Sequence, residues 1–342
     1  MAATKLEAIP PLIRAAQAHQ QALALHRAGR WAEAVEPYSV ALSLDPDNPA
    51  LRHAYGHLLL GLGDYPGGWP FYESRKDVAG TRSPRPPLAN EWSGEPIAGK
   101  RLLLWPEQGF GDMVQFSRFA PALRAAGAEV TLVCPPELAT FFATLGVEVV
   151  PYSASMTLPA PDGWAHLMSA PMILGSTIDT LPPPALRVPE DYREKWKGRV
   201  PEGLVGVVWR GSAANGNDAH RSLPESPIPA LDREGRLFAD LSDGVGDFAD
   251  TAAIVEQLDL VITVDTAMAH VVGSLGRPCW LLLPTFQQDW RWLQGRETSP
   301  WYPSVRIFRQ GPEGSWPPVI AAVAEALDTR EALSRGSITA SR

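Results

Sequence analysis

The spacing of apolar residues after residue 100 predicts strands that alternate with helices. Strand-like runs are RLLLW (101–105), EVTLVCP (129–135), VEVVPY (147–152) and WAHLM (164–168), and helical spacing occurs over 113–126, 136–145 and 171–178. Short apolar runs that alternate with helices are typical of an α/β unit built on a parallel sheet. A proline-rich passage, 181–192, ends this first unit.

The same alternation then begins again. Strand-like runs are LVGVVWRG (204–211), LDLVITV (258–264) and PCWLLLP (278–284), and helical patterns cover 250–258, 266–276 and 317–327. Two α/β units joined by a proline-rich hinge place a cleft between their sheet edges, where ligands bind at the carboxyl ends of the strands. The predicted fold class is therefore α/β, with domains over 100–198 and 199–330.

The first 78 residues follow a longer period that is typical of tetratricopeptide repeats, which are about 34 residues long. The small, turn, aromatic and helix-ending positions of such repeats match Ala22, Gly29, Trp31, Ala34, Tyr38, Ala41 and Pro46, and then Gly56, Gly63, Tyr65, Gly68 and Tyr72. The pattern predicts about two α-helical repeats over 1–78, followed by a linker at 79–99; a generic helical hairpin stays open as the alternative. Two repeats bury too little surface to stand alone, so they should pack on the rest of the chain.

Composition and charge exclude several classes of function. The chain has 342 residues and a net charge of −8, with no basic block that could follow a phosphate backbone, so no nucleic-acid partner is expected. It lacks the apolar core of a signal peptide and any run long enough to span a membrane, which favours a cytoplasmic protein. Cys134 and Cys279 sit in or beside apolar runs, and clustered His or Cys residues are absent from the sequence, so neither a metal site nor a cofactor is predicted.

A first polar cluster, WPEQGFGDMVQF (105–116), joins a predicted strand to a predicted helix. Its candidate cleft or acceptor residues are Glu107, Gln108, Gly109, Gly111 and Gln115, and Asp112 stands at the helix start. A dinucleotide fingerprint is excluded because the position of its third glycine is Val114. Asp112 either caps the helix or faces a ligand in the cleft.

A second cluster, VITVDTAMAH (261–270), places Asp265 and Thr266 between an apolar strand and a helix. The amides at such a helix start can hold a phosphate or diphosphate. His270 lies four residues after Thr266, on the same helical face, although a satisfied core histidine is an equally good interpretation.

A third cluster, WRGSAANGNDAHRS (209–222), follows the first strand of the second unit. It contains Arg210, Asn217, His220 and Arg221, and a pair of arginines suits phosphate oxygens. A merely solvated loop is the alternative.

Together with DFADTAAIVEQLDLVITVDTAMAH (247–270) and DWRWLQGRETSPWYP (289–303), these motifs resemble bacterial proteins in which tetratricopeptide repeats precede a glycosyltransferase domain related to the heptosyltransferases. The resemblance implies a GT-B fold of two facing Rossmann-like domains. It also implies an inverting, metal-independent enzyme that moves a sugar from a nucleotide-sugar donor to a glycan or protein acceptor. The acceptor would bind mainly to the first domain and the donor to the second.

The resemblance also implies roles for individual residues. Asp112 would be the general base, Asp265, Thr266, Ala267 and His270 would hold the phosphates of the donor, and Arg210 or Arg221 would neutralise the diphosphate. A carboxylate within hydrogen-bond reach of a sugar hydroxyl can take its proton as the hydroxyl attacks.

One segment departs from the family, because residues 223–246 are too few for the helix and second strand that relatives carry there. The second domain is therefore expected to be shortened and to lack that strand, which favours a rival function: a non-catalytic scaffold that binds a protein partner through the repeats. The presence of Asp112, Asp265 and His270 favours the enzyme. A nicotinamide oxidoreductase is disfavoured by the missing third glycine.

Overall fold

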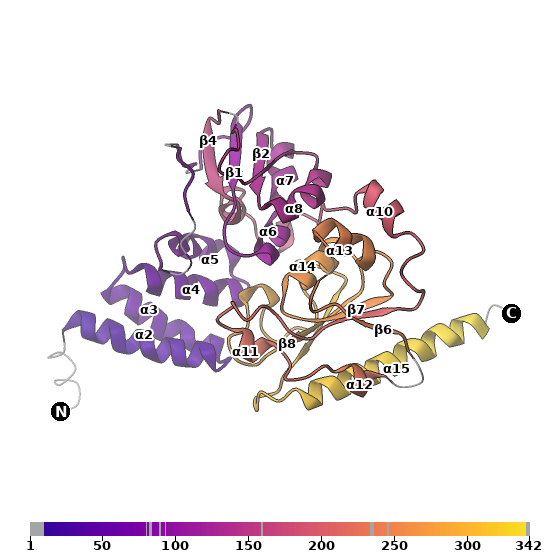
Figure 1. The fold of residues 1–342 in the computed structure, drawn as a ribbon. Helices are drawn as coiled ribbons and strands as arrows, with labels where there is room; N and C mark the ends of the chain where they lie inside the picture. The colour runs from indigo at the N-terminus through magenta and orange to yellow at the C-terminus, as the bar shows by residue number, and fades with distance from the viewer. Residues whose placement is uncertain are drawn as a thin grey trace, which may run out of the picture.

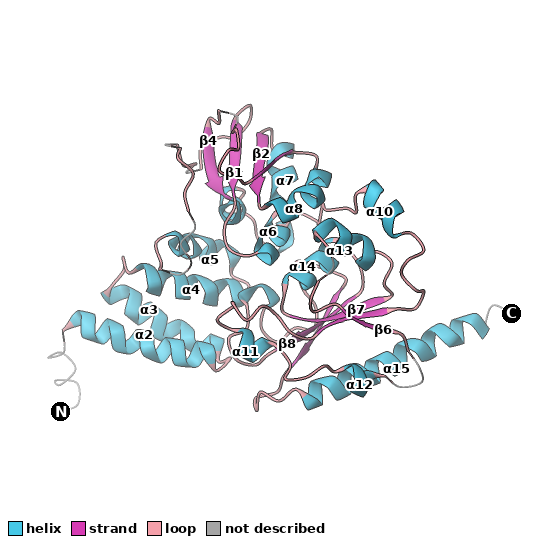
Figure 2. Ribbon diagram, in the orientation of Figure 1, coloured by secondary structure: helices cyan, strands magenta, loops and turns pink. Residues whose placement is uncertain are grey.

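The computed structural model shows a layer of N-terminal helices beside two parallel β-sheets (Figures 1 and 2). It describes residues 10–339, apart from 80, 82–83, 89, 93, 159, 233–235 and 245. The helices at the N-terminus are α2 (Pro11–Arg27), α3 (Trp31–Leu44), α4 (Pro49–Gly61), α5 (Tyr65–Tyr72) and the 3-10 turn η1 (Glu73–Lys76). Within the described part of the chain, no helix is both long enough and apolar enough to cross a membrane.

The N-terminal helices pack in pairs, α2 against α3 and α4 against α5, because small residues let them approach closely. A Cβ atom on Gly56 would lie 2.6 Å from the backbone nitrogen of Tyr72, so a larger residue would push α4 and α5 apart. Gly29 and Gly63 have φ angles of 75° and 91° in the turns after α2 and α4, where glycine carries no steric penalty. Helices thus form where the repeat spacing expects them, and their membership of the tetratricopeptide class stays a prediction.

The first unit, residues 101–180, holds a four-stranded parallel sheet in the order β3-β2-β1-β4. Its elements are β1 (Arg101–Trp105), α6 (Phe110–Phe116), α7 (Phe119–Ala125), β2 (Glu129–Cys134), α8 (Pro136–Phe142), η2 (Ala143–Leu145), β3 (Glu148–Pro151), β4 (Gly163–His166), η3 (Leu167–Ser169), α9 (Ala170–Ile173) and η4 (Ile178–Thr180). The four predicted strands are present. The single helix expected over 113–126 is wrong: it is broken at residues 117–118, where Pro121 cannot donate to the carbonyl four residues earlier.

The second unit, residues 205–339, holds a five-stranded parallel sheet in the order β6-β5-β7-β8-β9. Its elements are β5 (Val205–Val208), α11 (Asp218–Arg221), α12 (Ile228–Leu231), β6 (Phe238–Asp240), α13 (Phe248–Val255), β7 (Leu260–Val264), α14 (Ala267–Ser274), β8 (Cys279–Leu283), η5 (Trp290–Trp292), β9 (Val305–Arg309) and α15 (Pro317–Thr339). In the chain, a short helix, α10 (Glu190–Trp196), comes between the two units. Strand order reverses between β5 and β7, and such switch points are where open parallel sheets bind ligands.

The expectation that the second unit lacks its second strand is wrong. Strand β6 lies within 223–246 and pairs in parallel with β5, from Val205 opposite Phe238 to Val207 opposite Asp240. The connection fits into so few residues because its helix, α12, is a single turn and the strand is three residues long. Strand β6 therefore forms the edge of the sheet, next to β5.

One hydrophobic core runs through all three parts of the molecule. It joins Leu104 of β1, Val271 of α14 and Trp69 of α5 in a single cluster of buried residues. Aromatic rings connect the second unit to α5 within this cluster, since the ring of Trp290 in η5 packs 5.5 Å from the rings of both Trp69 and Tyr72. The N-terminal helices therefore pack on both units, as their small size requires.

A buried ion pair ties the N-terminal helices to the first unit. Arg75 of η1 donates two hydrogen bonds to Glu107, at 3.0 and 2.8 Å, and both side chains are at most 1% exposed. Glu107 also accepts a bond from the backbone nitrogen of Met168. Each of the two charges is tolerated in the interior only because the other is present, since a buried charge without a partner is strongly destabilising.

We expect Arg75→Met to lower the free energy of unfolding by ~3–5 kcal/mol, because it leaves Glu107 buried without its cation. Urea unfolding monitored by circular dichroism measures this change. Arg101→Met is the matched control, since Arg101 pairs with Asp162 at the surface and is 52% exposed. Similar small effects for the two variants would contradict a stabilising role for the buried pair.

Candidate functional site

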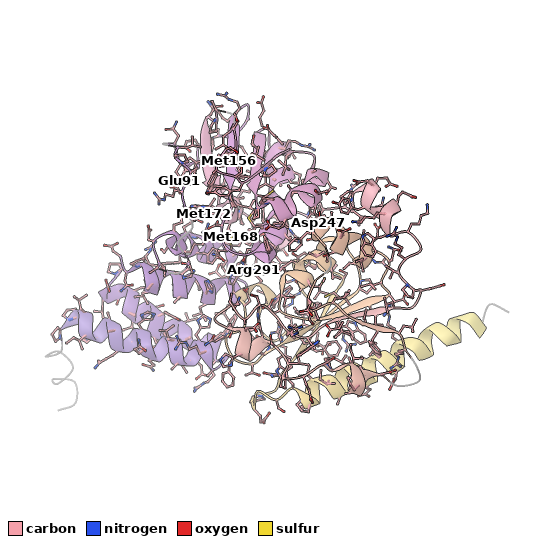
Figure 3. The ribbon with its side chains drawn as sticks, in the orientation of Figure 1. Glu91, Met156, Met168, Met172, Asp247 and Arg291 are labelled. Atoms are coloured by element: carbon pink, nitrogen blue, oxygen red, sulfur yellow. The ribbon has the colours of Figure 1, made fainter. Side chains whose placement is uncertain are left out.

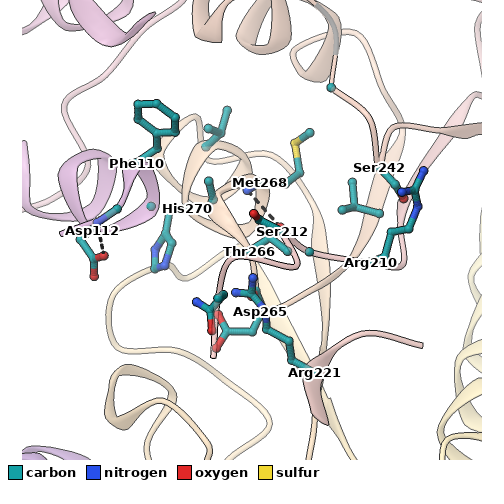
Figure 4. A pocket seen from close by; sticks show the side chains of 18 of the residues that line it. Phe110, Asp112, Arg210, Ser212, Arg221, Ser242, Asp265, Thr266, Met268 and His270 are labelled. Atoms are coloured by element: carbon teal, nitrogen blue, oxygen red, sulfur yellow. Dashed lines mark hydrogen bonds between the residues drawn. The ribbon is translucent and has the colours of Figure 1, made fainter. Parts of the chain in front are cut away.

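A cleft of about 870 Å³ lies at the carboxyl ends of β5, β6 and β7. One wall comes from the start of α6 in the first unit, and the opposite walls come from the loops after β5, β6 and β7. His57 of α4 and residues 287–289 close it further. Figure 4 shows Phe110 and Asp112 at one end of this cleft and Arg210 at the other, with His270 and Thr266 between them. The cleft thus occupies the switch point of the second sheet.

The start of α14 gives the cleft a set of backbone donors. Strand β7 is fully buried and ends at Val264, and Thr266 then caps the helix by accepting a bond from the amide of Met268 at 3.3 Å. The first-turn amides of a helix have no intrahelical partner and carry a partial positive charge. Thr266, Ala267 and Met268 line the cleft. The amide of Met268 is engaged by the cap, so an anion there meets the positive end of the helix and the amides that precede Met268.

Two arginines line the same cleft as this helix start. Arg221 donates to the carbonyl oxygen of Asp265 at 2.6 Å and to the carboxylate of Asp218 at 3.1 Å, and its side chain is 13% exposed. Arg210 pairs with Asp243 at 2.7 Å and is 42% exposed. Arg221 is therefore held in place at the cleft, whereas Arg210 stands more freely at its rim.

Asp265 carries a carboxyl whose proton affinity is strongly altered. Burial raises the pKa of Asp265 to about 7, and nearby Asp289 adds to the rise. The indole of Trp292 donates a hydrogen bond to Asp265 at 3.0 Å, which favours the ionised form and opposes that rise. The surroundings of Asp265 therefore favour the protonated acid more than water does.

Asp112 reaches the cleft from the first unit with both oxygens engaged. One oxygen accepts a bond from the amide of Gly109 at 3.0 Å, and the other accepts from Arg291 at 2.5 Å. Burial raises the pKa of Asp112, while the positive charge of Arg291 opposes the rise. Since a carboxylate has about four acceptor positions, two remain for a substrate hydroxyl.

Gly111 has a structural explanation in the packing of the two units. A Cβ atom at this position would lie 2.9 Å from Cδ2 of His270 and 3.3 Å from Cα of Ala267. Glycine therefore lets α6 approach α14, and this contact joins the two walls of the cleft.

His270 is held as a neutral ring. Its Nδ1 lies 3.1 Å from the hydroxyl of Tyr302, and its ring stacks on Trp292 at 5.3 Å. Burial lowers the pKa of His270 well below its ordinary value, so it brings no positive charge to the cleft at neutral pH.

The structure brings together most of the residues expected from the sequence. Residues that line the cleft are Gly109, Gly111, Asp112, Arg210, Asn217, Arg221, Asp265, Thr266, Ala267 and His270. Four expected residues do not line it: Glu107, Gln108, Gln115 and His220. Glu107 is buried against Arg75, Gln115 is buried beneath Arg291, and Gln108 has a φ angle of 59° in an exposed turn. His220 is exposed near Phe286, its ring 6.4 Å away.

Sequence patterns gave no role to four other residues at the site: His57, Asp289, Arg291 and Trp292. They come from α4 and from the stretch around η5, far from the first and third clusters in the chain. The sequence signal was the dense mixture of aromatic and charged residues in DWRWLQG (289–295). Among the residues that the structure describes, no group of His, Cys, Asp and Glu has the arrangement of a metal site.

No known family model matches the chain. It is 30% identical to Protein FlbA from Caulobacter vibrioides over 335 residues, an alignment that covers 82% of this chain and 55% of FlbA. The chain therefore spans about half the length of this relative.

Solved structures of glycosyltransferases are distantly similar. The glycosyl transferase family 9 protein from Veillonella parvula is 14% identical, with a TM-score of 0.45 over 64% of this chain and 88% of that one. ADP-heptose lps heptosyltransferase II from E. coli is also 14% identical, with a TM-score of 0.45 over 67% of this chain and 98% of that one.

The raised pKa of Asp265 implies a pH dependence of stability. Between the ordinary aspartate pKa of about 4 and about 7, the unfolded chain loses this proton while the folded chain keeps it, so the free energy of unfolding falls as pH rises. We expect Asp265→Asn to remove this loss. The stability of the variant relative to the wild type should increase from pH 4 to pH 7 and then level off, as measured by urea unfolding.

Asp162→Asn provides a control of opposite sign, because Arg101 lowers the pKa of Asp162 to about 2. That variant should lose stability relative to the wild type as pH rises from 2 to 4. A flat difference for Asp265→Asn between pH 4 and 7 would show that Asp265 ionises normally.

Proposed function

We propose that this chain is an inverting glycosyltransferase of GT-B architecture that takes its sugar from a nucleoside diphosphate donor. The observation that carries the proposal is the pairing of two features across one cleft. The second unit offers a helix start and Arg221 at its switch point, and the first unit presents the carboxylate of Asp112 on the other side. The motif resemblance to heptosyltransferase-related proteins agrees with this division of roles.

The donor's diphosphate would lie at the start of α14. The amides near Thr266, with Arg221 and Arg210, supply donors and positive charge to the oxygens of a diphosphate. As the bond between the anomeric carbon and the diphosphate breaks, negative charge grows on the leaving group, and these same groups stabilise it. This arrangement needs no metal ion.

Asp112 would act as general base. An acceptor hydroxyl attacks the anomeric carbon, its proton passes to a free lone pair of Asp112, and the nucleoside diphosphate leaves from the opposite face. Nucleophile and leaving group then lie on opposite sides of the sugar, which inverts the anomeric configuration. The acceptor is a glycan or protein hydroxyl bound against the first unit.

A non-catalytic scaffold is the second candidate, and the contacts of Asp112 are the observation that favours it. Both carboxylate oxygens already accept hydrogen bonds, one of them from a guanidinium, and such bonding weakens a base. In this alternative the N-terminal helices would bind a protein partner.

Binding measurements with free nucleoside diphosphates distinguish the glycosyltransferase from the non-catalytic scaffold. We expect ADP, UDP or GDP to bind in calorimetry, and Arg221→Ala to weaken binding roughly ten- to a hundredfold, since a charged hydrogen bond contributes about 1.5–3 kcal/mol. Arg101→Ala, at the amino end of β1, should leave affinity unchanged. Absence of binding to the whole panel, or equal loss in both variants, would favour the scaffold.

Release of nucleoside diphosphate from a nucleotide sugar tests the base. With the donor chosen from the nucleotide that binds, we expect Asp112→Asn to lower the release rate by ~10²–10⁴ while binding stays within about twofold. Asp162→Asn, on the surface of the first unit, should keep the full rate. If Asp112→Asn only lost ~1 kcal/mol of stability, Asp112 would be a helix cap and nothing more.

A further inference from the structure

Arg291 lies where the N-terminal helices, the first unit and the second unit meet (Figure 3). Its side chain is 4% exposed, and all three of its nitrogens are engaged. One donates to Asp112, a second donates twice to Asp289 at 3.0 and 2.8 Å, and the third donates to the amide oxygen of Gln115. Because the planar guanidinium is hydrogen-bonded at every nitrogen, it is held in a single orientation.

Residues in and just after η5 link Arg291 to α4 and α5. Its guanidinium stacks 4.6 Å from the ring of Trp290, and Trp290 in turn packs on Tyr65, Trp69 and Tyr72. After η5, the backbone nitrogen of Gln294 donates to the carbonyl oxygen of Gly61, the last residue of α4. A displacement of α4 or α5 would therefore shift η5 and the guanidinium with it.

We propose that Arg291 is the positioning residue for Asp112, and that helices α4 and α5 belong to the catalytic unit because they hold Arg291 in place. The proposal rests on the role of Asp112 as general base. It assigns the N-terminal helices a task inside the enzyme that differs from binding a separate partner.

The physical reason is that a buried carboxylate needs both charge and direction to serve as a base. Burial favours the neutral acid, which cannot accept a proton, and the adjacent guanidinium favours the ionised form. No other charged or titratable group described around Asp112 supplies a positive charge in place of Arg291. These groups are Asp289, Glu107, Tyr72 and the neutral rings of His57 and His270. The bond from Arg291 also fixes one oxygen, so the remaining lone pairs keep a constant direction.

Two variants of Arg291 separate charge from geometry. In Arg291→Met, carbon-13 NMR of labelled aspartate should show the titration midpoint of Asp112 rising by about one to three pH units, with Asp112→Asn used to assign the signal. In Arg291→Lys the charge remains, so the midpoint should stay near that of the wild type, but a single ammonium cannot reach Asp112, Asp289 and Gln115 at once. Nucleotide-sugar turnover should therefore fall at least tenfold in both variants.

A second pair of variants tests the helices. Trp69→Leu removes an aromatic contact to Trp290, so the midpoint of Asp112 should rise as it does in Arg291→Met, by a smaller amount. Tyr38→Leu is the control, since Tyr38 is equally buried but belongs to the separate core within α2–α4. It should reduce stability without moving the midpoint.

Calorimetry with ADP, UDP and GDP on the same proteins keeps this proposal distinct from the proposed function. Diphosphate binding should stay within about twofold in all Arg291 variants, because Arg221 and the start of α14 are unchanged. An unchanged Asp112 midpoint in Arg291→Met would overturn the positioning role, even if nucleotide still binds. An unchanged midpoint in Trp69→Leu would overturn the part assigned to the helices. If the wild-type protein bound none of these nucleotides, the proposed donor site would be refuted.

Discussion

The buried guanidinium of Arg291 is the constraint on which the arrangement of the molecule depends. A charge removed from water is tolerated only when it is paired and hydrogen-bonded, and Arg291 meets this condition with partners from two units. Asp112 and Gln115 come from α6 in the first unit, and Asp289 comes from the second. The position of the cleft wall that carries Asp112 is thereby fixed relative to the second sheet.

The same junction explains why the main hydrophobic cluster extends through all three parts of the molecule. Small residues and aromatic rings bring the parts together: Gly111 lets α6 approach α14, and Trp290 joins the second unit to α5. In the proposed function, the groups assigned to the diphosphate all come from the second unit, whereas the position of Asp112 depends on contacts with all three parts. On this proposal, a substitution at the junction would impair sugar transfer while leaving nucleotide binding in place.

The sequence predicted what depends on local pattern and missed what depends on tertiary contact. Buried parallel strands are continuous apolar runs, so β1 and β7 could be located, and the cap at Thr266 follows a general preference at helix starts. Glu107 looked like a cleft residue because its partner, Arg75, lies 32 positions away in the chain. Strand β6 is not predicted because residues 223–246 are too few for elements of typical length, whereas the structure uses a one-turn helix and a three-residue strand. Arg291 has no local signature beyond its aromatic neighbours.

A crystal structure with a bound nucleoside diphosphate tests the central claim most directly, because it locates the ligand relative to both walls of the cleft. The expected result is a diphosphate within hydrogen-bond distance of the amides near Thr266 and of the Arg221 guanidinium, with the terminal phosphate directed toward Asp112. A nucleotide bound elsewhere on the protein, or one whose terminal phosphate points away from Asp112, would contradict the assignment of this cleft as the site of sugar transfer.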